Sequence, residues 1–244
     1  MFKPGTVERY LEALLSGDRA SSRAVVEETL QSGVTAHNVY LDLIWPVMVE
    51  IDKLARGDRV NSVQEHLATR INRTIVDQLQ NKLPRRQKKN RRVVICCAQD
   101  QLQELGAQMM ADLFESDGWE VRFVGGGLTN EDILAYINSC APQLLIIYGA
   151  KASQAPDIRA LIDTIRSVNA WPDMRIMVSG GVFNRADGLW EEIGADMFAE
   201  NAADALQVAL TDQKFNPENR TVKRKKRSAD AEEPQLETIE VTVE

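Results

Sequence analysis

The sequence predicts an α/β protein in which an N-terminal four-helix bundle is followed by a five-stranded parallel sheet. Residues 6–83 show the three- and four-residue spacing of apolar side chains that is typical of helices. From residue 92 onward, short apolar runs alternate with helical segments, as in a sheet whose strands are connected by helices. We therefore expect a helical cap domain at residues 1–84, a basic linker at 85–91, an α/β domain at 92–211 and a disordered charged tail at 212–244.

Length and composition exclude several classes of protein. The 244 residues, 44% hydrophobic and 27% charged, suffice for one domain with a good core and a smaller companion. No run approaches the roughly 20 apolar residues that span a bilayer, and residues 1–17 lack a signal-peptide core. We therefore expect a cytoplasmic protein with no membrane contact. The net charge of −7 disfavours direct nucleic-acid binding. The three cysteines form no CxxC pair, which predicts reduced, buried thiols and no zinc site.

The cap is predicted from four amphipathic segments with short connections. They are expected at residues 6–15, 19–32, 36–56 and 62–83. The first three are followed by glycines, and the fourth ends before Pro84. Pro46 falls near the first turns of the third helix, where a proline is tolerated. Each helix carries one apolar stripe, so the four can pack into a small bundle.

The stretch Pro84–Arg92, PRRQKKNRR, carries six basic residues among nine. Such a run could contact phosphates, but its place between two periodic segments favours a solvated linker. We interpret it as the boundary between the two domains.

Five strands alternate with helices in the second part of the chain. Val93 to Cys97 form a continuous apolar run, which is typical of a parallel strand covered on both faces. The other strands are expected at residues 120–124, 144–147, 175–178 and 196–199. This alternation implies a doubly wound, flavodoxin-like sheet. In such a sheet ligands bind beyond the carboxyl ends of the strands, so the loop Ala98–Glu104 is the first place to search for a site.

Several site chemistries lack support in this scaffold. The loop after the first strand has no glycine before Gly106, which disfavours a dinucleotide fold. A phosphate-accepting receiver domain would end its third strand in an aspartate, and Tyr148 stands there. The two histidines, His37 and His66, both fall in the helical part, so nucleophilic catalysis lacks a base. We therefore predict no catalytic residues and no metal bound by protein ligands, and expect that the chain is not an enzyme.

The most specific pattern follows the first strand: Gln101-Leu102-Gln103-Glu104-Leu105-Gly106, continued by LGAQMMADLFESDGWEVRFVGG from Leu105. Over residues 1–210 the chain resembles the cobalamin-binding module of methyltransferase corrinoid proteins and of light- or cobalamin-sensing regulators. That module is a four-helix cap followed by a flavodoxin-like domain. Its loop reads Glu-x-His-x-x-Gly, and the histidine is the lower ligand of cobalt. The resemblance places Gln103 at the ligand position and Gly106 at the glycine.

Positions near the nucleotide tail of the cofactor follow from the same resemblance. Family members carry a serine at the position of Tyr148, beside Gly149, and often a threonine at that of Ala150. The paired glycines that line the tail correspond to Gly180 and Gly181. A tyrosine directed into the tunnel for the tail would fill it, whereas one directed into the core would leave it open. The sequence does not give the rotamer.

The cap supplies further candidates. Photoreceptor-like members have Trp-x-x-Gly and then Glu-His, and this chain has Leu54 in place of the tryptophan, followed by Glu65-His66. The resemblance implies that Glu65 and His66 face the upper side of the corrin, while a histidine on a helix is equally well a surface residue. Gly125 and Gly126 could let a flat ring approach the backbone closely, or could only relax the turn after the second strand.

The resemblance implies cobalamin as the cofactor and leaves its adenosyl or methyl form open. A glutamine amide is a poor cobalt ligand, so cobalamin would be bound without a lower histidine, through burial of its ring and tail. The function implied is a non-catalytic regulatory module that senses cobalamin or light and contacts a regulatory protein or a second copy of itself. Two alternatives stay open: a degenerate module that has lost the cofactor and acts as an interaction scaffold, and, less favoured, a corrinoid carrier for a methyltransferase.

Overall fold

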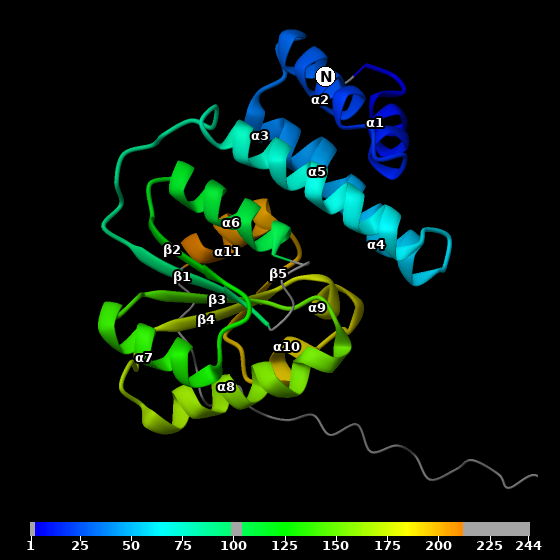
Figure 1. Cartoon of the computed structure of the whole chain (residues 1–244). Coiled ribbons are helices and arrows are strands. Elements are labelled where there is room, and N and C mark those ends of the chain that lie inside the picture. Colours follow the sequence, from blue (N-terminus) through cyan, green and yellow to red (C-terminus); the bar gives the residue numbers. More distant parts are fainter. Residues whose placement is uncertain (1–2, 99–103, 212–244) are drawn as a thin grey trace, which may run out of the picture.

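The computed structural model describes residues 3–98 and 104–211 (Figure 1). The four expected cap helices are present, the third in three consecutive segments. They are α1 (Thr6–Leu15), α2 (Arg19–Gln31), α3 (Ala36–Val39) continued by η1 (Tyr40–Ile44) and α4 (Trp45–Arg56), and α5 (Ser62–Gln80). Polar side chains fix the helix starts, because Asp18 accepts hydrogen bonds from the N–H groups of Ala20 and Ser21 and Asn61 forms a capping box with Gln64.

The third helix changes its hydrogen bonding at its centre. Residues Tyr40–Ile44 form a π-helical turn in which the N–H of Trp45 donates to the carbonyl of Tyr40. The next residue, Pro46, has no N–H to donate to the carbonyl of Asp42, and we attribute the turn to this missing donor. One extra residue in a turn rotates all later side chains by about 100°. The turn therefore sets which face of α4 points at the sheet.

The sheet has five parallel strands in the order β2-β1-β3-β4-β5, as a doubly wound fold requires. The strands are β1 (Arg92–Cys97), β2 (Glu120–Gly125), β3 (Leu144–Tyr148), β4 (Arg175–Ser179) and β5 (Met197–Ala199). Cys97 pairs with Tyr148, and Tyr148 with Ser179, so the carboxyl ends of the three central strands lie in line. The order reverses between β1 and β3, and the loops that follow these strands flank a crevice.

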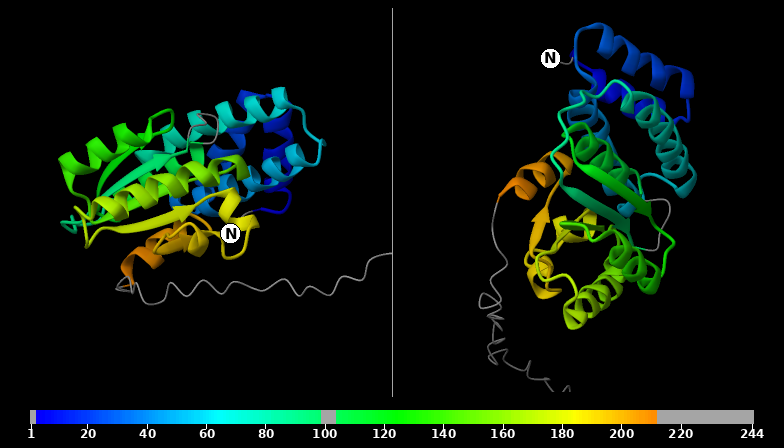
Figure 2. Two further views of the ribbon diagram at one scale, coloured as in Figure 1. Left: turned by 90° about the horizontal axis from the view of Figure 1, so that it is seen from below. Right: turned by 90° about the vertical axis from the view of Figure 1, so that its left-hand side faces the viewer.

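Helices cover both faces of the sheet. α6 (Leu105–Ser116) and α11 (Ala202–Leu210) lie on the face turned toward the cap, and α7 (Asn130–Cys140) and α8 (Ala155–Val168) lie on the other (Figure 2). The larger of two buried clusters joins Tyr40 and Ile75 of the cap to Phe114 of α6 and Ile95 of β1. The cap and one face of the sheet therefore share a single hydrophobic core.

Several short elements were not expected from the sequence: η3 (Ala152–Gln154), α9 (Gly181–Arg185) and α10 (Leu189–Glu192). The last strand begins at Met197 and not at Asp196. The side chain of Asp196 accepts a hydrogen bond from the N–H of Ile176 at 2.6 Å and pairs with Arg166. No helix within residues 3–98 and 104–211 combines the length and the apolar character that crossing a membrane requires.

The basic linker is exposed over most of its length but is fixed to the turn between α6 and β2. Arg86 and Lys89 pair with Asp117 at 2.9 and 2.5 Å. Gly118 has φ +96°, and a Cβ atom there would overlap the carbonyl oxygen of Gln87. The linker is thus solvent-exposed and at the same time held against the α/β part by Asp117 and Gly118. We keep residues 85–91 as the proposed domain boundary.

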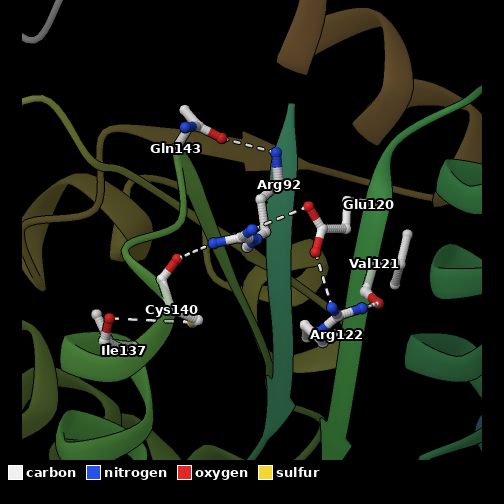
Figure 3. A network of polar contacts seen from close by, with 7 residues as sticks. All are labelled: Arg92, Glu120, Val121, Arg122, Ile137, Cys140 and Gln143. Carbon is white, nitrogen blue, oxygen red and sulfur yellow. Dashed lines mark hydrogen bonds and ion pairs between the residues drawn. The ribbon is translucent and has the colours of Figure 1, made fainter. Parts of the chain in front are cut away.

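A polar network closes the amino-terminal edge of the sheet (Figure 3). Arg92 pairs with Glu120 at 3.0 Å and donates to the carbonyl of Cys140, and its N–H donates to Gln143 at 2.6 Å. Arg122 pairs with the other oxygen of Glu120 at 2.7 Å. The hydrogen bond from Arg92 lowers the pKa of the Glu120 carboxyl. These contacts lie at the end of the strands opposite the crevice, so we assign them to strand pairing.

Candidate functional site

A cavity of about 180 Å³ lies between the cap and the carboxyl ends of the strands. The residues that line it from the cap share one face of α4 and one face of α5: Trp45, Met48, Val49, Ile51, Asp52, Arg56, Glu65, Thr69 and Asn72. The opposite wall comes from the start of α6 and the loops after β3 and β4: Leu105, Gly106, Tyr148, Ala150, Gly180, Gly181, Asn184 and Arg185. The cavity therefore exists only because the cap and the sheet face each other.

Tyr148, at the end of β3, points onto the first turn of α6. A Cβ atom on Gly106 would lie 2.7 Å from Cζ of Tyr148 and would overlap its hydroxyl oxygen. The ring of Tyr148 thus lies between the two directions that the sequence left open: it lines the cavity and also packs against the larger hydrophobic cluster. Burial raises the pKa of the Tyr148 hydroxyl, which is therefore neutral and can donate a hydrogen bond.

Arg185, on α9, crosses from the sheet to the cap. Its Nη2 donates to the carbonyl of Ala150 at 2.5 Å, and its Nη1 lies 3.4 Å from Asp52 on α4. Asp52 also pairs with Arg56 at 2.9 Å. A Cβ atom on Gly181 would lie 2.5 Å from Nη1 of Arg185. The arginine therefore occupies the space in front of Gly181 at one side of the cavity.

Two other glycines of the predicted site, Gly149 and Gly180, are required by the packing of the fold itself. Gly180 has φ +105°, and a Cβ atom there would overlap the carbonyl oxygen of Gly149. A Cβ atom on Gly149 would lie 2.8 Å from Cδ1 of Ile158. Backbone and core packing thus require these two glycines. At Gly106 and Gly181 the nearest atoms belong to the polar ends of Tyr148 and Arg185, two side chains that line the cavity.

Glu104 joins the cap to the second strand, next to the cavity. Its Oε2 pairs with Arg73 of α5 at 2.8 Å, and its Oε1 accepts from the N–H of Gly126 at 2.7 Å. Gly125, with φ +71°, would place a Cβ atom 3.0 Å from the same carboxylate. Gly125 and Gly126 therefore contact Glu104 and do not line the cavity.

Asn72 is fully buried in α5 and belongs to the cavity wall. Its Oδ1 accepts a hydrogen bond from the hydroxyl of Tyr10 at 2.6 Å. Its Nδ2 has no acceptor among the residues that the structure describes. A buried donor without a partner is rare in a folded protein, so this amide group stands out as a candidate for contact with a ligand.

Asp112 lies where α6 meets the cap. The hydroxyl oxygen of Tyr40 is 2.9 Å from Oδ2 of Asp112 and 2.9 Å from the carbonyl oxygen of Val76. One hydroxyl proton cannot serve both acceptors fully. Burial raises the pKa of Asp112 to about 7. A protonated Asp112 resolves the geometry, because it donates to Tyr40 while Tyr40 donates to Val76.

The structure brings together five of the predicted site residues, namely Glu65, Gly106, Tyr148, Gly180 and Gly181. Leu54, His66, Gly125, Gly126 and Gly149 do not line the cavity, and Gln103 lies outside the described residues. His66 is exposed because one residue along a helix turns its side chain about 100° away from Glu65. No group of three or more His, Cys, Asp or Glu within residues 3–98 and 104–211 could hold a metal ion.

Five further residues of the cavity wall were not predicted from the sequence: Trp45, Met48, Asp52, Asn72 and Arg185. The spacing of Trp45, Met48 and Asp52 on one helix face was a readable signal. So was a polar Asn72 within the buried stripe of α5. Arg185 gave no signal, because its contact with Asp52 joins residues 133 positions apart.

The residues that line the cavity are of the kinds found in cofactor sites, but the cavity is smaller than such sites. Apolar walls with a few polar groups are typical of cofactor sites, which hold roughly 300–1,000 Å³ for drug-sized ligands. The cavity is smaller, at about 180 Å³. The atoms in front of Gly106 and Gly181 belong to side-chain ends of Tyr148 and Arg185. The ends of these two side chains therefore limit the volume of the cavity.

Comparison with known proteins covers both parts of the chain. Two family models, each described as a B12 binding domain, match residues 6–80 and 91–210. Monomethylamine corrinoid protein 1 of Methanosarcina mazei is 22% identical over 217 residues, which cover 83% of this chain and 95% of that protein. Monomethylamine corrinoid protein 2 of Methanosarcina acetivorans is 27% identical over 116 residues, 46% of this chain and 52% of that protein.

A solved structure supports the architecture. The monomethylamine corrinoid protein of Methanosarcina barkeri superposes with a TM-score of 0.73 at 19% identity, over 84% of this chain and 97% of that one. At this identity the likeness establishes the fold, including a helical cap in front of a parallel sheet.

Proposed function

This chain belongs to the B12-binding family, and we propose that within it the protein is a non-catalytic sensing module that holds cobalamin between the cap and the sheet. The observation that carries the proposal is the cavity shared by α4, α5 and the carboxyl ends of the strands. A ligand there touches both parts at once. Its presence therefore changes the free energy of the contact between cap and sheet, which is what a sensor requires.

Two ion pairs connect the cap to the sheet on either side of the cavity. They are Asp52–Arg185 at 3.4 Å and Arg73–Glu104 at 2.8 Å. Because their side chains are partly exposed, each contributes little to stability. Arg185 would have to leave the space in front of Gly181 to admit a cofactor there, and its pair with Asp52 would then be lost. Occupancy of the cavity and position of the cap would thereby be coupled.

Residues of this chain would hold and orient the cofactor. Trp45 and Met48 provide apolar contact from the cap, and Glu65, Asn72 and Tyr148 provide polar groups. Bound cobalamin would supply a cobalt centre that can be alkylated and whose alkyl form responds to light. With Gln103 at the position of the family's histidine, we propose that cobalt has no lower histidine ligand, because an amide is a weak donor to this metal.

A second candidate, a corrinoid carrier for a methyltransferase, is favoured by relatives that match most of the chain. These relatives are named monomethylamine corrinoid proteins, and 95% of the length of one is covered. Such a carrier needs a protein partner, as a sensor does. The two differ in what the cap does when the upper ligand of cobalt changes.

Hydrogen–deuterium exchange on the full chain separates these functions. We expect hydroxocobalamin to slow exchange in α4, α5 and residues 180–185. For a sensor, illumination of the adenosylcobalamin complex should then raise exchange in α4 and α5. A carrier should show the first effect and no response of the cap to light. With a methyltransferase and a thiolate acceptor it should pass the methyl group of methylcobalamin to the thiolate, forming a thioether and leaving cob(I)alamin. Absence of any effect of hydroxocobalamin would contradict both and support a scaffold that has lost its cofactor.

A further inference from the structure

In the part of the chain that the structure describes, the side-chain oxygen of Asn72 has a hydrogen-bond partner and its side-chain nitrogen has none. The side chain is fully buried, and Tyr10 donates to its Oδ1 at 2.6 Å. Tyr10 is itself buried, and this is the one hydrogen bond of its hydroxyl within residues 3–98 and 104–211. A buried phenol must donate to an acceptor, and only Oδ1 can accept. Tyr10 therefore fixes the orientation of the amide.

This orientation leaves Nδ2 available on the other side of the amide. Tyr10 belongs to α1 and does not line the cavity, whereas Asn72 does. The oxygen is thus directed at α1, and Nδ2 is the other polar atom of an amide whose residue lines the cavity. Nδ2 has no acceptor in the described part of the chain. Folding has buried this donor at a cost, and contact with a ligand would recover that cost.

The neighbours of Asn72 restrict the chemistry of the acceptor. Tyr148 contributes a second neutral donor to the same cavity. Glu65 and Asp52 line it too, and the guanidinium groups of Arg56 and Arg185 lie against Asp52. The described lining thus holds two guanidinium groups and two carboxylates, so it has no net positive charge to balance an anionic ligand. Neutral donors among apolar walls match a neutral carbonyl oxygen, as in a carboxamide.

We propose that Asn72 is a ligand-binding residue whose Nδ2 donates to a carboxamide oxygen at the periphery of the bound corrinoid. The inference rests on the proposed function, since a corrin ring carries such amide arms around an apolar body. Tyr10 is a positioning residue that presents the donor and does not itself touch the ligand.

The test compares Tyr10→Phe with the double variant Tyr10→Phe/Asn72→Leu in the full chain. The double variant replaces both members of a buried hydrogen bond by apolar groups of similar size, so its unfolding temperature should equal or exceed that of Tyr10→Phe. Its affinity for hydroxocobalamin, measured by absorbance titration, should be about 3–10-fold weaker than that of Tyr10→Phe, the effect of one neutral hydrogen bond. If the leucine does not fold, Tyr10→Phe/Asn72→Ala gives the same comparison.

Three outcomes are distinguishable. Weaker binding with unchanged stability supports a role for Asn72 in ligand recognition. Equal affinity of the single and double variants overturns the assignment of Asn72 and leaves the proposed function intact. If the parent protein itself binds no hydroxocobalamin, the proposed function and this inference both fail.

Discussion

The hydroxyl of Tyr148 occupies the volume that a methyl group on Gly106 would need. The end of β3 and the first turn of α6 are therefore interlocked at the wall of the cavity. Gly106 and Tyr148 both occupy positions that correspond to cofactor-binding residues in the family. In this structure the ring of Tyr148 lies over Gly106. Whether a ligand can enter depends on this pair.

Gly106→Ala should destabilise the protein by about 1–3 kcal/mol, because the added methyl group forces the tyrosine ring to move. Combining it with Tyr148→Ser should remove most of that cost. Urea unfolding of the parent, both single variants and the double variant gives the coupling free energy, expected at about 0.5–3 kcal/mol. Additive effects would show that the two residues do not interact.

Tyr148→Ser should strengthen binding of hydroxocobalamin. If the outward rotamer of the tyrosine is populated at about one part in ten, the gain is about tenfold. Tyr148→Phe is the comparison variant: it keeps the ring over Gly106 but loses the hydroxyl donor, so it should bind no more tightly than the parent. Equilibrium dialysis of the three proteins measures this. Equal affinity for Tyr148→Ser and the parent would mean that the ring does not obstruct the ligand.

Asp112 should make stability depend on pH in a defined direction. Its pKa in the folded protein is about 7, against an ordinary value of 3.8, because burial disfavours the charged form. The folded state therefore holds a proton that the unfolded chain releases above about pH 4. The contribution of this group is fully present below pH 4 and is lost as the pH rises through 7.

Asp112→Asn should flatten this dependence, because an amide can donate to Tyr40 at every pH. The free energy of unfolding, measured in urea from pH 5 to pH 8, should fall less in the variant than in the parent. Asp77 and Glu115 also raise the pKa of Asp112 and stay in place in both proteins, while Gln80 lowers it by a hydrogen bond. Parallel curves would indicate that Asp112 is ionised across this range.

Gly118→Ala tests the fixed linker separately from the site. The residue has φ +96°, and the new methyl group would overlap the carbonyl oxygen of Gln87. A loss of about 2–4 kcal/mol in unfolding free energy is expected from strain and the clash together. Affinity for hydroxocobalamin should stay within about twofold of the parent. Gly5→Ala is the control for backbone strain alone. Gly5 is exposed and also has a positive φ, but no atom lies within 4 Å of the added methyl group.

Much of the fold was predictable because its signals are local. The helices of the cap and the strands around Val93 and Leu144 follow from apolar spacing within short windows. The π-helical turn before Pro46 was not predictable, since the proline fits an ordinary first turn equally well. The fold class could be predicted because element order alone determines it.

Only part of the candidate site could be predicted from the sequence. Gly106 and Tyr148 stand out by comparison with a motif. Asn72 and Arg185 acquire their significance from Tyr10 and Asp52, which only the tertiary fold brings near. Gly180 matched the motif too, yet the structure shows a requirement of the backbone there. A motif thus identifies positions but not the physical reason for each residue.

We propose above that the cavity between cap and sheet binds cobalamin without a lower histidine. The most direct measurement is the visible absorption spectrum of the purified protein after incubation with hydroxo-, methyl- and adenosylcobalamin in the dark and removal of free cofactor by gel filtration. We predict retained colour with a spectrum that lacks nitrogen ligation below cobalt, and the appearance of such ligation in Gln103→His. A colourless protein that elutes as a compact species, with Tyr148→Ser equally colourless, would contradict the claim.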